Sequence, residues 1–227
     1  MAELLLALAL PHGASALRLL DGLPGVRWVK VGSILMTREG PDLVDRLNQR
    51  GLSVFLDLKW HDIPNTVAGA VRAAVGAGVR MVTVHTLGGV EMMEAAAAAA
   101  GAAVTVVGVT VLTSHSAASY AAATGSSPAG IGAEAVRLAG LAKRAGLGGV
   151  VASALEVELV REVMGPTAAV VVPGIRRVAD PSGDQARVAA PREAIAAGAS
   201  HLVIGRPVLM AADPAAAWQE FEEDTLR

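Results

Sequence analysis

The sequence contains no cysteine among its 227 residues. Disulfide bonds, thiolate nucleophiles and cysteine-ligated zinc are therefore excluded, and the composition is compatible with a reducing cytoplasm. Lysine is also scarce, because only Lys30, Lys59 and Lys143 occur among the 19 basic residues. Arginine holds its proton permanently, whereas a lysine amine can give its proton up. The retention of Lys59 between two carboxylates therefore marks it as a functional candidate.

Aromatic residues make up 3% and charged residues 18% of the chain, whereas hydrophobic residues reach 53%. Such a chain is not intrinsically disordered, and its core must be built from Ala, Val and Leu. The net charge of −2 lacks the basic excess that nucleic-acid binding requires. We therefore expect no nucleic acid polymer as a partner.

Two apolar stretches raise the question of a targeting or membrane segment. Residues 4–10 are apolar, but no positive charge precedes them as it would in a signal peptide. Residues 95–112 contain no charge over a length that formally meets the requirement for a membrane span. Gly101 divides that stretch into an Ala-rich half and a β-branched half, which predicts a helix followed by a strand. We therefore expect no membrane segment.

Short β-branched runs alternate with longer segments rich in Ala, Leu and Arg. The near-continuous apolar character of these runs is typical of strands buried on both faces of a parallel sheet. The predicted strands are residues 4–10, 27–32, 53–58, 81–85, 104–112, 149–153, 168–172 and 201–204. Helices are predicted over residues 41–50, 66–77, 91–100, 133–145 and 192–197, and a glycine follows each of them.

No linker rich in Pro, Ser or charge divides the chain, so residues 1–227 are predicted to form a single domain. Eight β/α units in this length predict an α/β fold, a (β/α)₈ TIM barrel. An open doubly wound sheet is the alternative. In a barrel, functional residues lie at the C-terminal ends of the strands and in the βα loops that follow. The unusual polar residues of this chain are concentrated at those positions.

The most informative segment, residues 55–66, reads F-L-D-L-K-W-H-D-I-P-N-T. Side chains alternate along a strand, so Asp57 and Lys59 are expected to point together into the barrel mouth, with Asp62 in the next loop. The carboxylates favour the charged form of Lys59, which suits a proton donor or charge stabiliser rather than a Schiff-base amine. Lys30 ends the preceding strand and is expected to join them. For the D-x-K-x-x-D spacing alone, a solvated salt-bridge cluster is the alternative interpretation.

The string D-L-K-W-H-D-I-P-N-T at residues 57–66 resembles the signature of the orotidine 5′-phosphate decarboxylase family. The similarity continues at family-like spacing in K-V-G (30–32), V-H (84–85), V-T-V-L-T-S (109–114), P-G-I-R (173–176), G-D-Q (183–185) and I-G-R-P (204–207). The resemblance implies a cytoplasmic enzyme of pyrimidine biosynthesis. It would convert orotidine 5′-monophosphate to uridine 5′-monophosphate and CO₂ without a metal or an organic cofactor.

The resemblance also implies roles for individual residues. Lys30, Asp57, Lys59 and Asp62 would form a charged network in which Lys59 protonates C6 of the pyrimidine as CO₂ leaves. Asp57 would lie close to the substrate carboxylate and disfavour it. Loss of CO₂ leaves charge on a carbon with no adjacent electron sink, so a nearby ammonium is needed to stabilise that charge.

A shared active site is a further implication of the resemblance. Asp62, together with Ile63 and Thr66, would enter the active site of a partner subunit. The chain is therefore expected to form a homodimer, and its small-molecule partner is a nucleotide.

The loops after the last two strands, residues 173–186 and 205–207, are predicted to bind phosphate. Gly205 permits close backbone approach, Arg206 supplies a two-pronged donor and Gln185 offers an amide. Arg176 is added to this set by the resemblance. Phosphate binding would offset the cost of placing Asp57 against the substrate carboxylate.

Two further segments are expected to contact the substrate. Residues 176–187 form a polar loop with Pro and Gly, which is predicted to act as a lid over the phosphate. The resemblance places Thr113 and Ser114 near the edge of the pyrimidine; a flexible surface loop is the alternative. His61 and His85 lie near the mouth and are interpreted as hydrogen-bonded structural residues rather than metal ligands.

The first strand departs from the family pattern. Members of the family usually carry Ala-Leu-Asp there, with the Asp contacting the ribose hydroxyls, whereas this chain has Ala7, Leu8 and Ala9. We therefore expect catalysis to persist with weaker substrate binding.

Two other functions are compatible with parts of the pattern. A metal-dependent relative in the same barrel superfamily, such as a hexulose-phosphate synthase, shares the D-x-K-x-x-D string, but the complete H-D-I-P-N-T continuation opposes it. A barrel that binds nucleotide monophosphates without turnover is favoured only by Ala9.

Overall fold

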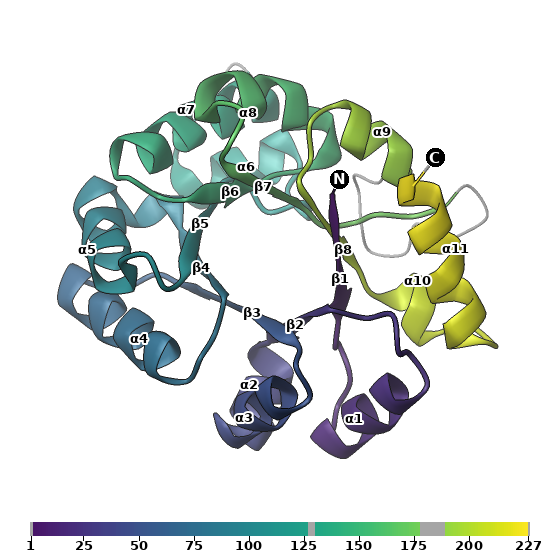
Figure 1. Cartoon of the computed structure of the whole chain (residues 1–227). Coiled ribbons are helices and arrows are strands. Elements are labelled where there is room, and N and C mark those ends of the chain that lie inside the picture. Colours follow the sequence, from purple (N-terminus) through teal and green to yellow (C-terminus); the bar gives the residue numbers. More distant parts are fainter. Residues whose placement is uncertain (1, 127–129, 178–188, 227) are drawn as a thin grey trace.

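The computed structural model describes residues 2–126, 130–177 and 189–226. Eight parallel strands follow one another around a closed barrel, and pairing of the first with the last completes the ring (Figure 1). An open doubly wound sheet would leave two unpaired edges, so the predicted TIM barrel is confirmed and that alternative is excluded. The strands are β1 (Glu3–Ala7), β2 (Trp28–Gly32), β3 (Ser53–Trp60), β4 (Met81–His85), β5 (Thr105–Val109), β6 (Gly149–Val151), β7 (Ala169–Val172) and β8 (His201–Ile204).

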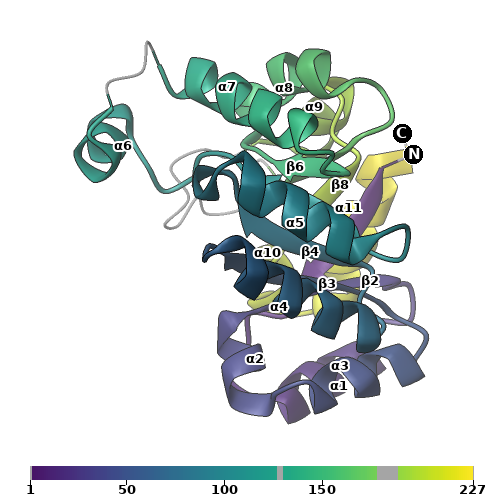
Figure 2. The same ribbon diagram turned by 90° about the vertical axis from the view of Figure 1, so that its left-hand side faces the viewer.

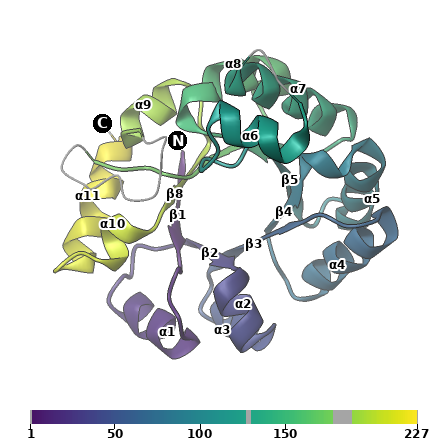
Figure 3. The same ribbon diagram turned by 180° about the vertical axis from the view of Figure 1, so that it is seen from behind.

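Helices form an outer ring around the strands, as the view from behind also shows (Figure 3). In chain order they are α1 (Gly13–Asp21), α2 (Ser33–Glu39), α3 (Asp42–Gln49), α4 (Pro64–Gly76), α5 (Val90–Ala100), α6 (Ala117–Thr124), α7 (Ile131–Arg144), α8 (Val157–Met164), α9 (Pro191–Ala196), α10 (Arg206–Leu209) and α11 (Pro214–Leu226). Two short 3₁₀ turns, η1 (Thr86–Gly88) and η2 (Ala154–Glu156), follow β4 and β6.

The five helices predicted from the sequence correspond to α3, α4, α5, α7 and α9. The glycine after each of them adopts a positive φ, from +55° at Gly101 to +107° at Gly198. A side chain strains this conformation, so glycine ends these helices and turns the chain toward the next strand.

Three predicted strands end earlier than expected. The runs 4–10, 104–112 and 149–153 leave the ladder at residues 7, 109 and 151. Apolar residues just beyond these ends remain buried, such as Leu8 at 2% and Val111 at 3% exposure. The apolar pattern therefore reports burial of the first loop residues at the barrel mouth, not continuation of the ladder.

The hydrophobic core of the described residues has two main clusters, beside a small third cluster of Val111, Tyr120 and Leu138. One fills the space between the strands and the helix ring, and the other fills the barrel interior with Leu5, Ala7, Phe55, Met81, Val107, Ala169, Val171 and Val203. Because these side chains plug the barrel, the cavity bordered by Lys30, Asp57 and Lys59 opens toward the C-terminal ends of the strands. The stretch 95–112 divides into α5 and β5 as predicted, and in the described part of the chain no helix is long and apolar enough to cross a membrane.

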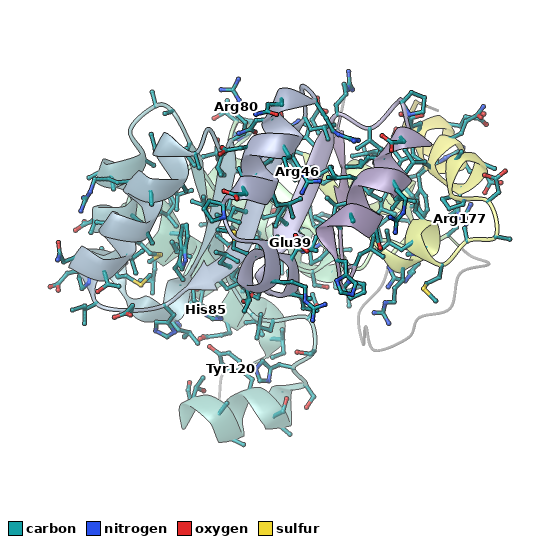
Figure 4. All side chains as sticks on the ribbon, turned by 90° about the horizontal axis from the view of Figure 1, so that it is seen from below. Glu39, Arg46, Arg80, His85, Tyr120 and Arg177 are labelled. Carbon is teal, nitrogen blue, oxygen red and sulfur yellow. The ribbon has the colours of Figure 1, made fainter. Side chains whose placement is uncertain are left out.

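Helix α6 stands away from the helix ring on the mouth side of the barrel (Figure 2). In Figure 4, Arg80 and His85 lie at the two ends of β4, and Tyr120 of α6 lies beyond the His85 end. The Tyr120 hydroxyl donates to Oε1 of Glu134 at 2.7 Å, and burial together with this bond raises the pKa of Tyr120 to about 12. This buried contact joins α6 to α7.

Candidate active site

Three charged side chains meet at the mouth of β2 and β3. Nζ of Lys30 lies 3.1 Å from Oδ2 of Asp57, and Nζ of Lys59 lies 2.8 Å from Oδ1 of the same carboxylate. The Asp57 side chain is only 10% exposed, so this is not a solvated surface cluster. The predicted association of Lys30, Asp57 and Lys59 is therefore present within a single chain.

Opposing influences act on the Asp57 carboxyl. Burial, the largest single influence, favours the neutral acid, but the two ammonium groups and their hydrogen bonds outweigh it and lower the pKa of Asp57 below its usual value. Asp57 is therefore an anion at neutral pH. With two cations and one anion, the cluster has a formal charge of +1 and can accept a further negative group.

The contact between Asp57 and Lys59 was predicted from strand alternation, but its geometry is more specific. Lys59 has a φ of +52° and is the one described non-glycine residue with positive φ. The pairing of β3 with β4 shifts register between Leu56 and Trp60. Such a bulge re-aims side chains at the end of a strand, and here it directs Lys59 toward Asp57.

A cavity of about 330 Å³ opens above this cluster. That volume lies in the range of small-molecule sites. The predicted residues that line it are Lys30, Asp57, Lys59, Thr113, Ser114, Arg176, Gly205 and Arg206. They come from β2, β3 and the loops after β5, β7 and β8, which is why segments distant in sequence form one site.

The described residues that were predicted to bind phosphate lie on the β7 and β8 side of this cavity. Arg176 is 7% exposed, and its Nη1 donates to the carbonyl of Ile175 at 2.8 Å. Arg206 and Gly205 follow β8 and line the same cavity. Gln185 lies outside the described residues, as does most of the predicted lid at 176–187.

The other three predicted site residues lie elsewhere. Asp62, Ile63 and Thr66 are exposed in the loop after β3 and in the first turn of α4, and the cavity lining within the described chain does not include them. Oδ1 of Asp62 accepts a hydrogen bond from the backbone N–H of Ile63 at 2.6 Å. Within one chain, therefore, Asp62 does not join the cluster of Lys30, Asp57 and Lys59.

Sequence reasoning did not identify the apolar part of the cavity. It is formed by Phe55, Val109, Val151, Val171 and Val203, which alternate with outward-facing residues on their strands. That alternation marks inward positions but does not distinguish the cavity wall from the barrel plug. Thr83 was also missed, although it is the polar residue within the buried part of β4; its hydroxyl contacts both Asp57 and Lys59.

Two histidines flank the mouth. The rings of His61 and His85 stack with centroids 5.6 Å apart, and Nδ1 of His85 accepts from the backbone N–H of Leu87 at 3.4 Å. Burial, followed by the nearby cationic groups, lowers the pKa of His85 to about 4. His85 is therefore neutral at physiological pH and caps the turn after β4. In the described residues, no group of three or more His, Asp or Glu side chains is arranged to hold a metal ion.

Comparison with known proteins supplies a family for this geometry. The model of the orotidine 5′-phosphate decarboxylase / HUMPS family matches residues 2–221. The chain is 52% identical over 220 residues to orotidine 5′-phosphate decarboxylase of Halorhodospira halophila, covering 95% of this chain and 92% of that protein. It is 50% identical over 226 residues to the enzyme of the same name from Alkalilimnicola ehrlichii, covering 98% and 95%. The crystal structure of orotidine 5′-phosphate decarboxylase from Lactobacillus acidophilus superposes with a TM-score of 0.86 at 33% identity and covers all of both chains.

Proposed function

The chain belongs to the orotidine 5′-phosphate decarboxylase / HUMPS family, and on that premise we propose that it decarboxylates orotidine 5′-monophosphate to uridine 5′-monophosphate. The observation that carries the proposal is the cluster of Lys30, Asp57 and Lys59 facing a cavity of nucleotide-binding size. The reaction would serve pyrimidine biosynthesis, and a cytoplasmic location fits such a nucleotide substrate.

The charges of the cluster suit each stage of the reaction. A substrate carboxylate bound beside Asp57 places two anions together, which raises the energy of the bound substrate. When the bond from C6 to the carboxylate breaks, its electron pair stays on C6 and CO₂ leaves. The Lys59 ammonium stabilises that charge as it develops and then transfers a proton to C6. Water returns a proton to the lysine amine, which balances the cycle.

Lys30 has a supporting role in this proposal. Its ammonium contacts the other carboxylate oxygen of Asp57 from the one that Lys59 contacts, and the Lys30 side chain is 19% exposed. It holds Asp57 ionised and in place while the substrate binds. The two ammonium groups place positive charge beside Asp57, so the proposed reaction does not require a metal ion to supply it.

Binding at the far end of the substrate offsets the repulsion at the carboxylate. We assign the phosphate to the side of the cavity lined by Arg176, Gly205 and Arg206. Arginine presents a planar fork that matches phosphate oxygens, and a glycine lets them approach the backbone. Thr113 and Ser114 line the cavity after β5 and are assigned to the edge of the pyrimidine. Gln185 is retained as a phosphate-binding residue from the sequence pattern.

We further propose a homodimer in which each subunit completes the other's site. The mouth of β2, β3 and β4 carries exposed apolar side chains at Ile34 (65%), Ile63 (67%) and Leu87 (39%). Exposed apolar side chains gathered in one region are typical of protein interfaces. Asp62 and Thr66 lie in the same region, so a second copy packed there would receive Asp62 beside its own Lys59.

A direct assay tests the function. Purified protein is mixed with orotidine 5′-monophosphate, and the ultraviolet change on formation of uridine 5′-monophosphate is followed with and without EDTA. We expect turnover that resists the chelator. Absence of turnover in the folded protein would overturn the proposal. A titration with uridine 5′-monophosphate would then separate the alternatives, because tight binding indicates an inactive nucleotide-binding barrel and no binding indicates a relative with another substrate.

The scarcity of lysine supplies a matched control for the proton donor. Lys59→Ala should lower kcat by at least about 10³-fold, because it removes both the proton and the stabilising charge. Lys143→Ala should retain full activity, since its Nζ donates to the carbonyl of Val163 at the surface, away from the barrel mouth. Equal activity in the two variants would exclude Lys59 as the donor.

A further inference from the structure

The bulge between β3 and β4 leaves an uneven pairing next to the charged cluster. Phe55 pairs with Met81 and Leu56 with Val82, but the next pair joins Trp60 to Val84. Residues 57–59 of β3 therefore stand opposite a single residue of β4, Thr83. Regular ladder bonds cannot serve three residues with one partner, so the backbone of this segment needs another source of hydrogen bonds.

The side chain of Thr83 supplies that source. Its Oγ1 accepts a hydrogen bond from the backbone N–H of Lys59 at 2.8 Å and donates one to Oδ1 of Asp57 at 3.1 Å. Thr83 is completely buried, so water does not compete for these bonds. The same Oδ1 atom accepts from Nζ of Lys59. One hydroxyl thus links the backbone of Lys59 to the carboxylate that its own side chain contacts.

The backbone conformation of Lys59 needs this hydrogen bond. Its φ of +52° lies in the left-handed region, a strained backbone conformation that non-glycine residues adopt when the surrounding structure holds them there. The bond from the Lys59 N–H to Thr83 is a contact that holds this conformation. Without it, the residue is free to relax toward an extended backbone, which would turn the ammonium away from Asp57.

We infer that Thr83 is a positioning residue for the reaction, which fixes the Lys59 ammonium and the Asp57 carboxylate in one geometry through its hydroxyl. The inference rests on the proposed function, because it assigns to Thr83 the orientation of the proposed proton donor. Thr83 is absent from the cavity lining within the described chain, so it acts through Lys59 and Asp57 rather than on the substrate.

Two other buried threonines provide the comparison. Thr86 and Thr110 are equally inaccessible, but their hydroxyls donate to the carbonyls of Val109 at 2.7 Å and Val151 at 2.8 Å. Those bonds satisfy backbone groups between strands and reach no charged residue. Thr86 is therefore a matched control for the loss of a buried hydroxyl.

The test compares Thr83→Val with Thr83→Ser and Thr86→Val in steady-state kinetics. Valine keeps the shape of threonine and removes both bonds, so we expect kcat to fall about 10- to 100-fold, with KM changed less than about threefold. Serine keeps the hydroxyl and should restore kcat to within about threefold of the unaltered protein. Thr86→Val should retain kcat. Thr83→Ala is made in parallel, because it removes the hydroxyl without a branched apolar side chain beside Asp57, and should show the same loss of kcat.

A pH profile separates positioning from a general loss of stability. Without the donated bond the Asp57 carboxylate is less stabilised, so the acid limb of kcat/KM should move to higher pH in Thr83→Val and Thr83→Ala but not in Thr86→Val. A kcat in folded Thr83→Val or Thr83→Ala within threefold of the unaltered protein would overturn the inference. An equal loss in Thr86→Val would do the same. Absence of turnover in the unaltered protein would instead defeat the proposed function, and the role of Thr83 with it.

Discussion

Nζ of Lys59 lies 2.8 Å from Oδ1 of Asp57, although the two residues are separated by one position in the same strand. In a regular strand, residues two apart are about 6.6 Å apart along the strand axis. The left-handed backbone at Lys59 and the bulge against β4 allow the side chains to meet. Because Lys30 reaches the other oxygen of Asp57, removal of this one carboxylate alters the environment of both lysines.

Asp57→Asn should therefore impair both activity and stability. It leaves two ammonium groups beside a neutral amide, and we expect destabilisation of about 1–3 kcal/mol. It also removes the repulsion against the substrate carboxylate, so kcat should fall by about 10²-fold or more while KM does not rise, because the bound substrate is no longer destabilised. Denaturant unfolding and steady-state kinetics measure the two effects. Unchanged kcat would show that Asp57 has only a structural role.

The assignment of the phosphate to Arg206 predicts a dependence on the substrate's phosphate. Arg206→Gln should lower kcat/KM for orotidine 5′-monophosphate by about 10²-fold, mainly through KM. The substitution removes the paired, charge-assisted hydrogen bonds that a guanidinium donates to a phosphate. Slow turnover of orotidine, which has no phosphate, should be unaffected by the same substitution. Arg192→Gln, which removes an exposed ion pair with Asp224, is the control. Equal losses with both substrates would place Arg206 outside the phosphate site.

Shared active sites predict complementation between two inactive variants. Lys59→Ala and Asp62→Ala should each be nearly inactive as homodimers. After mixing, unfolding and refolding together, a heterodimer would contain one site with both an intact Lys59 and an intact Asp62 from the other subunit. Random assembly should then restore about a quarter of the normal activity. If the mixture stays as inactive as its components, Asp62 does not act across a dimer interface.

Ala9 lines the cavity and is exposed, where family members usually carry an aspartate. Ala9→Asp should lower KM for orotidine 5′-monophosphate by about tenfold, because a carboxylate there can accept hydrogen bonds from the ribose hydroxyls. The 2′,3′-dideoxy analogue of the product should inhibit the two proteins equally, since it lacks both hydroxyls. A stronger inhibition of Ala9→Asp by that analogue would contradict ribose recognition as the cause.

His85 predicts an acid dependence of stability. Its folded-state pKa of about 4 lies below the unfolded value of 6.5, mainly because of burial. Above pH 6.5 both states are neutral and the full stability is present. Between pH 6.5 and 4 the unfolded chain takes up the proton first, so the free energy of unfolding falls with falling pH.

His85→Phe keeps an aromatic ring against His61 and cannot titrate. Urea unfolding at a series of pH values should show a shallower decline between pH 6.5 and 4 in this variant than in the unaltered protein. Stability at pH 8 serves as the reference, because it isolates the loss of the cap bond from Leu87. An identical slope in both proteins would exclude a buried neutral His85.

The sequence by itself determined the barrel and much of the site. Repetition of apolar runs and glycine-ended helices specified eight β/α units, and a barrel brings the C-terminal ends of all its strands to one mouth. Lys30, Asp57 and Lys59 could therefore be grouped before their contacts were known. Gly205 and Arg206 were placed by their position after the last strand, whereas Thr113, Ser114 and Arg176 were placed by the resemblance to the family. All five line the same cavity.

Tertiary structure alone decided where strands end, how Lys59 is oriented and which residues stay outside the cavity. Apolar residues such as Leu8 and Val111 are buried by loops as well as by ladders, so hydrophobicity could not locate the strand ends. The bulge arises from the pairing of β3 with β4, and no local pattern in residues 57–59 specifies it. The role of Thr83 depends on that pairing. Thr83 lies 24 residues after Lys59 in the sequence, and its hydroxyl becomes a partner of Lys59 only when β3 and β4 lie side by side.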